Sequence, residues 1–292
     1  MNKLIFVEKA ETDINDLNAH PEKLFKQMRC SQCKVLFIDS KIDQDFMSQK
    51  FSLQKTNDID IWLESMIGRY ENKRYNTLLE NVVKLNTYKS RNTRSPKILD
   101  IGCSIGTFLL IVKKMGWDPY GVELHPVYFS AVKRFFGKKI YPGEFLDIDF
   151  KDLKFNFITL FEVLEHTTLP LETLLKAKRL LSEDGVIAIT VPTSGHTYLK
   201  YLFYKLVGNI PGGRFYRKNV AIHGHITNFS SQSVYKIAEN ANLEVAEIEC
   251  IKKDGDSFFN FCYYYLTFLI HKLSFHKVTL GHTLRFILKP KK

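Results

Sequence analysis

Residues 97–123, KILDIGCSIGTFLLIVKKMGWDPYGVE, decide the fold that this sequence predicts. The stretch starts with a short, largely apolar run at 98–101, as expected of a parallel strand that is covered on both faces. A turn follows, and residues 107–115 then carry apolar side chains at helical spacing up to Gly116, a typical helix stop. Residues 120–122 predict a second strand. The order strand, turn, helix, strand is typical of a doubly wound α/β fold.

Two features of this unit predict that it binds a nucleoside-containing cofactor. Gly102 and Gly106 bound the turn, where a side chain would obstruct a ligand lying against the backbone. Glu123 ends the second strand about 20 residues later, where a carboxylate can accept hydrogen bonds from both hydroxyls of a ribose.

The same turn indicates which cofactor is bound. The dinucleotide fingerprint needs glycine at Ser104 and glycine or alanine at Thr107, and this sequence has neither. Asp100 precedes the turn, and a carboxylate there suits a cationic ligand better than a pyrophosphate. S-adenosylmethionine (SAM) carries a sulfonium, an ammonium and a ribose but no phosphate. The turn therefore favours SAM and disfavours an NAD-linked enzyme.

Three motifs in order, LDIGCSIGTFL (99–109), GVELHP (121–126) and FITLFEVLEH (157–166), resemble the class I SAM-dependent methyltransferases. The narrower resemblance is to the branch with an EVLEH signature, which includes ubiquinone-pathway O-methyltransferases and sugar C-methyltransferases with an N-terminal zinc-ribbon-like segment. It covers roughly residues 97–249. One departure is Ser104, where the family more often has glycine.

The resemblance implies a set of cofactor-binding residues. In the family, the position of Glu144 accepts a hydrogen bond from the adenine amino group, and the next backbone amide donates to the ring. Phe145 either stacks on the base or is an ordinary core phenylalanine. The implied set comprises Asp100, Gly102, Cys103, Ser104, Gly106, Glu123, Leu124, Glu144, Phe145, Phe161 and Glu162.

The remaining pattern alternates strands and helices, which predicts a Rossmann-like, doubly wound α/β fold. The resemblance adds that its sheet is mostly parallel and seven-stranded, with an antiparallel last strand. The expected strands are 139–141, 155–161, 186–191, 243–251 and 283–288, and the expected helices include 126–136 and 171–181.

The first ninety residues form an N-terminal appendage that is harder to interpret. Cys30 and Cys33 resemble the second half of a small zinc ribbon, but a structural zinc site needs four ligands, and only His20 lies nearby. Bound zinc, a relic ribbon and two ordinary thiols all remain open. Residues 58–85 have helical periodicity, and in the resembling family such helices form a lid.

These patterns divide the chain into an N-terminal segment, 1–93, and a methyltransferase domain, 94–292. Insertions are expected at 193–224 and 252–281, and the first is expected over the mouth of the site, where loops commonly carry function.

The EVLEH motif offers a candidate cation site. If it forms a helical turn, Glu162, Glu165 and His166 lie on one face, and two carboxylates with an imidazole could ligate Mg²⁺ or Mn²⁺. Small-RNA 2′-O-methyltransferases and ubiquinone-pathway O-methyltransferases use a similar trio with a metal. In the alternative reading the motif is structural, with Glu165 capping backbone amides and His166 lining the pocket.

A second histidine motif, HGHITNFS at 223–230, resembles an H-x-x-x-F-[ST] element that precedes the last large helix of the family. Ser230 is a suitable N-cap for that helix. His225 matches the family position and is the first candidate for a general base or an acceptor contact. His166 is the second catalytic candidate, and His223 is a further alternative.

Composition restricts the partners and the compartment. The 292 residues, 45% of them hydrophobic, can bury a sizeable core. A net charge of +11 favours acidic partners, but no arginine-rich tract or RNA-binding signature is present, so nucleic acid is disfavoured. Five cysteines and no secretory signal indicate a reducing cytoplasm.

Two aromatic, lysine-containing segments, 197–207 and 258–275, leave membrane contact open. The apolar span of the second is shorter than the roughly 20 residues that cross a bilayer. It either packs on the sheet or joins the first segment in a surface that rests on the inner face of a membrane or forms a dimer.

The sequence therefore predicts a SAM-dependent methyltransferase acting on a small-molecule acceptor, either a glycan precursor or a quinone-like lipid. The alternative is a catalytically inactive SAM-binding module for sensing or for binding a partner.

Overall fold

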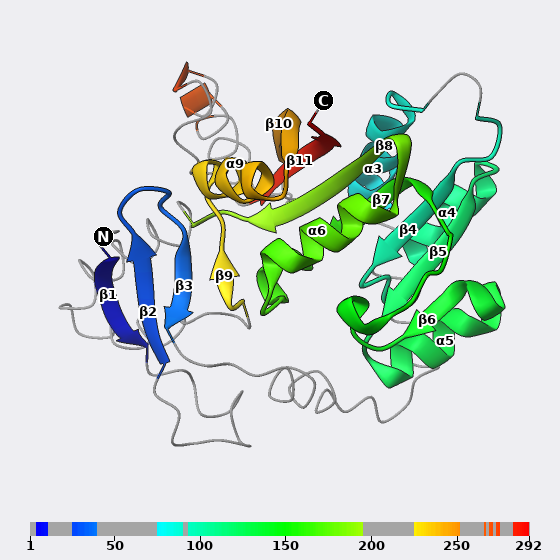
Figure 1. Ribbon diagram of the computed structural model, residues 1–292, viewed down its shortest axis with the longest axis horizontal. Helices are drawn as coiled ribbons and strands as arrows, with labels where there is room; N and C mark the ends of the chain where they lie inside the picture. The colour runs from blue at the N-terminus through cyan, green and yellow to red at the C-terminus, as the bar shows by residue number, and fades with distance from the viewer. Residues whose placement is uncertain are drawn as a thin grey trace.

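A computed structural model describes two sheets and the helices that pack on the larger one (Figure 1). The residues that it describes are 4–10, 25–39, 75–89, 93–194, 225–251 and 283–291, with five single positions between 266 and 274.

The larger sheet has seven strands in the order β10-β11-β8-β7-β4-β5-β6. Strands β4 to β8 pair in parallel, and β11 is antiparallel to both β8 and β10. The predicted mostly parallel, doubly wound sheet with an antiparallel last strand is confirmed. Its strands are β4 (Lys97–Ile101), β5 (Asp118–Glu123), β6 (Ile140–Pro142), β7 (Phe155–Phe161), β8 (Leu181–Pro192), β10 (Leu243–Ile251) and β11 (Thr283–Pro290).

Helices cover both faces of this sheet. α3 (Tyr75–Asn86) and α4 (Thr107–Lys114) bury their apolar sides in one core cluster, and α5 (Pro126–Phe136) packs beside α4. α6 (Pro170–Leu180) and α9 (Ser231–Asn240) bury theirs in a second cluster. Because both faces are covered, β7 reads as the nearly continuous hydrophobic run FNFITLF.

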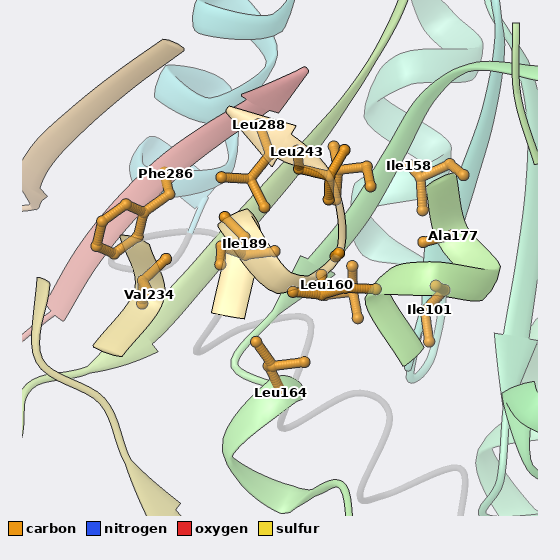
Figure 2. Packing of buried hydrophobic residues seen from close by; sticks show 14 of the residues in the cluster. Ile101, Ile158, Leu160, Leu164, Ala177, Ile189, Val234, Leu243, Phe286 and Leu288 are labelled. Atoms are coloured by element: carbon orange, nitrogen blue, oxygen red, sulfur yellow. The ribbon is translucent and has the colours of Figure 1, made fainter. Parts of the chain in front are cut away.

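The second cluster shows how strand alternation builds the core. Ile158 and Leu160, two residues apart on β7, point to the same face, where they lie beside Ala177 of α6 and Ile189 of β8 (Figure 2). Leu160 and Ile189 are fully buried. Phe157, which directly precedes Ile158, faces the other cluster and stacks on Trp117 with ring centroids 4.7 Å apart.

Helix starts follow the sequence signals. His125 caps α5, with Pro126 in its first turn, and the His125 ring nitrogen Nδ1 accepts a hydrogen bond from the Val127 backbone N–H. Ser230 caps α9 in a reciprocal capping box with Ser233. The predicted N-cap role of Ser230 is confirmed.

The smaller sheet joins the N-terminal segment to the rest of the chain. Its order is β1 (Leu4–Ala10), β2 (Phe25–Cys30), β3 (Leu36–Asp39) and β9 (Thr227–Asn228), all antiparallel. In addition, the Ser230 hydroxyl donates a hydrogen bond to the Cys33 carbonyl. The domain boundary between residues 93 and 94 stays a prediction. Pairing of β3 with β9 connects the segment before this boundary to the domain after it.

Cys30 ends β2, and Cys33 lies in the tight turn between β2 and β3. The Lys34 N–H donates to the Cys30 carbonyl at 3.0 Å, and Lys34 has a left-handed φ of 60°. Both thiols are free and half-buried. Among the described residues, no group of metal ligands includes this pair, and His20 lies outside them. Zinc binding here stays a prediction.

Several sequence predictions fall on residues that the structure does not describe. These are the helices expected before residue 75, His223, the segment 197–207, the insertion at 193–224 beyond residue 194, and most of the insertion at 252–281. Within the described ranges, no helix has both the length and the apolar character needed to cross a membrane.

A polar network fastens α3 to the strand pair β10 and β11. Arg285 Nη1 donates to Asn81 Oδ1 at 2.6 Å, and Arg285 Nε donates to Glu249 Oε2 at 3.1 Å. Lys84 Nζ donates to Glu249 Oε1 at 2.7 Å. Burial alone would raise the pKa of Glu249, but the hydrogen bonds from Lys84 and Arg285 lower it to about 2.

The variant Glu249→Gln should therefore unfold more easily at neutral pH, by about 1 kcal/mol because the carboxylate is partly exposed. A depressed carboxyl pKa contributes stability that is fully present above its ordinary value of 4.5 and is lost as the pH falls toward 2. Thermal unfolding across this range should show a smaller loss of stability in Glu249→Gln than in the native protein. Glu244→Gln, at an exposed position of the same strand, is the control. Parallel pH curves for the native protein and Glu249→Gln would contradict the assignment.

Candidate functional site

A cavity of about 250 Å³ opens at the carboxyl ends of β4, β5 and β7. β4 lies between β5 and β7, so the strand order reverses at this point, where open α/β sheets bind their ligands. The lining comprises Ile101, Gly102, Ser104, Val122, Glu123, Leu124, His125, Tyr128, Gly143, Glu144, Phe145, Glu162, Val163, His166, Thr167, Thr168 and Thr173.

The turn after β4 needs its glycines mainly because of the protein's own packing. Gly102 and Gly106 have φ values of 73° and 82°, in the left-handed region. A Cβ at Gly102 would lie 2.6 Å from Val163 Cγ2, and one at Gly106 would lie 2.5 Å from Val132 Cγ2. The sequence argument attributed both glycines to a ligand, but only Gly102 lines the cavity, and Gly106 is buried.

Ser104 occupies a third left-handed position in the same turn, with φ 51°. Glycine adopts this conformation at less cost than serine. The Ser104 backbone N–H donates to Glu123 Oε2 at 2.7 Å, which helps hold the residue in this conformation.

Glu123, at the end of β5, is buried and fixed in orientation. Oε2 accepts from Ser104 N–H, and Oε1 accepts from the His125 N–H at 2.7 Å. Burial raises the pKa of Glu123, while these backbone N–H groups lower it. Each oxygen keeps a further lone pair, and Glu123 lines the cavity, which suits a pair of vicinal hydroxyls.

Asp100 lies behind the cavity wall. It is buried, and its Oδ1 accepts a hydrogen bond from the Thr159 hydroxyl at 2.6 Å. Burial and the charge of Glu123 raise the pKa of Asp100 and the Thr159 hydrogen bond lowers it, with a net pKa of about 7. A cationic ligand nearby would favour the charged form of Asp100.

Two more of the predicted cofactor residues also stand outside the lining. Cys103 is buried beside α4 and α5, and Phe161 packs edge-on against Phe108 with ring centroids 5.1 Å apart. The structure brings together the others at the cavity: Gly102, Ser104, Glu123, Leu124, Glu144, Phe145 and Glu162.

One end of the cavity is formed by Gly143, Glu144 and Phe145, after β6. The Gly143 N–H donates to the Glu123 carbonyl at 3.0 Å, which brings this segment beside β5. Burial raises the pKa of Glu144, and the backbone N–H groups of Phe145 and Leu146 lower it. The Phe145 ring is 3% exposed and lies 5.9 Å from the Phe150 ring, so Phe145 is a core residue that also contributes to the cavity wall.

Sequence reasoning missed several lining residues. His125 and Tyr128 stack with ring centroids 4.3 Å apart, on the first turn of α5. Thr167 and Thr168 directly follow the EVLEH motif. A usable signal was present, because polar residues just beyond a parallel strand lie at the ligand edge of the sheet.

The EVLEH motif does not form the expected helical turn. Glu162 is exposed and has a left-handed φ of 57°, and only Leu164–His166 forms a short 3-10 helix, η4. The Glu162 N–H donates to the Thr190 carbonyl at 3.0 Å, which keeps this residue in register with β8. The expected common face of Glu162, Glu165 and His166 is therefore wrong.

A different trio forms instead. Glu165, His166 and His225 each offer a ligand atom, and these atoms lie within 4.8 Å of one another. The imidazole rings of His166 and His225 meet edge to face, with centroids 4.8 Å apart. The Ile226 N–H donates to the Glu165 carbonyl at 2.9 Å, which fixes the irregular segment before β9 against η4.

The Glu165 carboxyl group is fully buried, and neither oxygen accepts a hydrogen bond from another described residue. Burial raises its pKa well above the ordinary value, although its own backbone N–H lowers it. A buried carboxylate without partners is costly. Either a proton or a bound cation would remove that cost, and the adjacent imidazoles are suitable cation ligands.

Comparison with known proteins places this geometry in a wider context. A family model described as "Methyltransferase domain" matches residues 70–248. No curated protein sequence matches the chain.

Two solved structures share the fold. One is a chain from the complex between the Haloferax volcanii Trm112 methyltransferase activator and a methyltransferase, at 16% identity and TM-score 0.52, covering 81% of this chain and 97% of that chain. The other is Haemonchus contortus phosphoethanolamine N-methyltransferase 2 with phosphomonomethylethanolamine and S-adenosylhomocysteine. It is 15% identical, with TM-score 0.55, and the match covers 84% of this chain and 61% of that chain. At these identities the likeness shows the fold alone.

Proposed function

The chain belongs to the methyltransferase-domain family and is a SAM-dependent methyltransferase, and from this premise we propose that it methylates a hydroxyl or carbon acid of a small molecule. A glycan precursor or a quinone-like lipid is the acceptor class. The observation that carries the proposal is the arrangement of the cavity, with a fixed carboxylate, Glu123, at the ribose position and an imidazole, His166, in the same wall.

SAM would lie along the carboxyl ends of β4 and β5. Glu123 would accept from the ribose hydroxyls, and Glu144 with the backbone of Phe145 would contact the adenine. Gly102 and Ser104 would lie under the methionine part, with the charge of Asp100 behind them favouring the ammonium and sulfonium groups.

The reaction is an in-line displacement at the methyl carbon. The acceptor atom forms a bond to that carbon while the carbon–sulfur bond breaks, and the products are the methylated acceptor, S-adenosylhomocysteine and a proton. The protein's main tasks are to orient the acceptor and exclude water. A hydroxyl or carbon acid must also lose its proton, and His225 or His166 would accept it.

The test is incubation of the pure protein with SAM labelled in the methyl group and a metabolite extract, followed by identification of the labelled product. Transfer to a small glycan precursor or a quinone-like lipid is expected. Label found only in protein or nucleic acid would overturn the acceptor class. Binding of SAM without any transfer would favour a SAM-binding module instead.

As an alternative to the base role of the two histidines, we propose that Glu165, His166 and His225 hold a divalent cation, Mg²⁺ or Mn²⁺. These residues fit such an ion because one buried carboxylate lacks other partners and two imidazoles adjoin it. The mixed oxygen and nitrogen set favours Mn²⁺ over Mg²⁺. When bound, the ion would supply Lewis acidity that lowers the pKa of an acceptor hydroxyl.

A chelator should then abolish turnover, and added Mn²⁺ should restore it. Direct binding of Mn²⁺, measured by its electron paramagnetic resonance signal, should be lost in Glu165→Gln. It should persist in Glu162→Gln, the matched control within the same motif, because Glu162 lies outside the trio. Full activity in chelator together with no Mn²⁺ binding would show that the trio does not bind a metal.

A further inference from the structure

Lys176 is a half-buried residue of α6 whose ammonium group contacts one short segment, residues 145–148. Nζ donates to the backbone carbonyls of Phe145 at 2.7 Å, Leu146 at 2.9 Å and Ile148 at 2.6 Å. An ammonium group has three N–H donors, and the three carbonyls use all of them. The segment includes the single-turn 3-10 helix η3 (Phe145–Asp147).

The ammonium also lies over two rings that help form this part of the core. Nζ is 5.1 Å from the Phe145 ring centroid and 5.7 Å from that of Phe150. Both distances fall within the range of cation–π attraction. Lys176 therefore holds the backbone and the aromatic side chain of the same residue, Phe145.

The segment that Lys176 contacts begins in the cavity wall, because Phe145 and its neighbour Glu144 line the cavity. A peptide group is planar, so its carbonyl and N–H point in opposite directions. The Phe145 carbonyl faces Lys176, so the N–H of the same peptide group, on Leu146, points away from Lys176. Lys176 thus fixes the orientation of the peptide group that follows Phe145, one residue beyond Glu144.

We propose that Lys176 is a positioning residue for recognition of the adenine base, which sets the place of Glu144 and of the Phe145 backbone without touching the cofactor. The inference rests on the proposed placement of SAM, because it takes the end of the cavity at Glu144 and Phe145 as the base end. Lys176 lies outside the cavity lining. Its loss therefore lowers affinity for the base and leaves the groups around the methyl carbon in place.

The test uses Lys176→Met, which keeps an apolar stem on Phe145 and Phe150 but removes the ammonium. Calorimetry should show S-adenosylhomocysteine bound roughly five- to tenfold more weakly, since three carbonyls lose a charged donor. At saturating SAM, kcat should stay within about twofold while KM for SAM rises, because only the base end has moved. Lys176→Arg, which keeps a charged donor, should fall between the native protein and Lys176→Met. Lys178→Met, on the same helix, is the control.

A second ligand separates base recognition from general loosening of the fold. S-inosylhomocysteine carries an oxygen where the adenine amino group would face Glu144. The native protein should prefer S-adenosylhomocysteine, and in Lys176→Met this preference should shrink by about the factor by which S-adenosylhomocysteine binding weakens. Equal weakening of both ligands, or unchanged binding, would overturn the inference. If the native protein binds neither ligand, the placement of SAM itself is wrong, which is a distinct result.

Discussion

Glu123→Ala is expected to weaken the binding of SAM and S-adenosylhomocysteine by more than about 1.5 kcal/mol, because hydrogen bonds to a charged group are among the strong ones. The Glu123 carboxylate is held by the N–H groups of Ser104 and His125, so it needs no reorientation when a ribose arrives. Calorimetry with both ligands measures the loss. Unchanged affinity in a folded Glu123→Ala protein would contradict the ribose assignment.

In Glu123→Ala, the Ser104 and His125 N–H groups also lose their acceptor, so the turn after β4 can loosen as well. Glu123→Gln keeps an acceptor oxygen for one of these N–H groups and so separates loss of the ribose contact from loosening of the turn. A cycle that combines Glu123→Gln with 2′-deoxy-S-adenosylhomocysteine isolates the contact to one hydroxyl. The deoxy ligand should cost the native protein more affinity than it costs Glu123→Gln. Equal costs would mean that Glu123 supports the turn alone.

His225→Ala is expected to lower kcat by about 10² to 10⁴ if His225 accepts the acceptor's proton. Affinity for SAM should stay nearly unchanged, because His225 contacts the His166 ring but is outside the cavity lining. Single-turnover kinetics and calorimetry on the same preparation measure the two effects. A parallel loss of kcat, SAM affinity and thermal stability would show that the histidine is structural.

Two further variants distinguish the roles that the trio can play. His225→Gln keeps hydrogen-bonding capacity but lacks useful basicity, so a fully active Gln protein would contradict the base assignment. His166→Ala should affect both SAM affinity and kcat, since His166 lines the cavity. If Mn²⁺ binding is lost in His225→Ala together with activity, the residue acts as a ligand of the ion.

The fold was predictable because its signals are local. The apolar run of β4, the spacing of α4 and the stop at Gly116 depend on residues that are neighbours in the chain, and each was confirmed. The same holds for Phe155–Phe161, Leu243–Ile251 and the N-cap at Ser230. Patterns of this kind reflect burial and backbone hydrogen bonding within single elements.

Local patterns failed where a residue's neighbours come from elsewhere. Gly106 is needed because Val132 of α5 would meet a side chain there, which the spacing of the turn cannot show. Glu162 was expected beside Glu165 on a helical face. Instead its N–H bonds to the Thr190 carbonyl of β8, its backbone is left-handed, and it is not part of the trio.

By itself, the sequence determined the doubly wound sheet, the glycine turn and the carboxylate at Glu123, because alternating elements and short-range spacing are written along the chain. Only the tertiary structure decided which groups meet. The tertiary structure brings His225 into contact with His166, next to the backbone hydrogen bond from Ile226 to Glu165. It also brings the Lys176 ammonium to the backbone carbonyls that follow Glu144. Such contacts join residues far apart in the chain, so their partners depend on how the sheets and helices pack and are not encoded in any one segment.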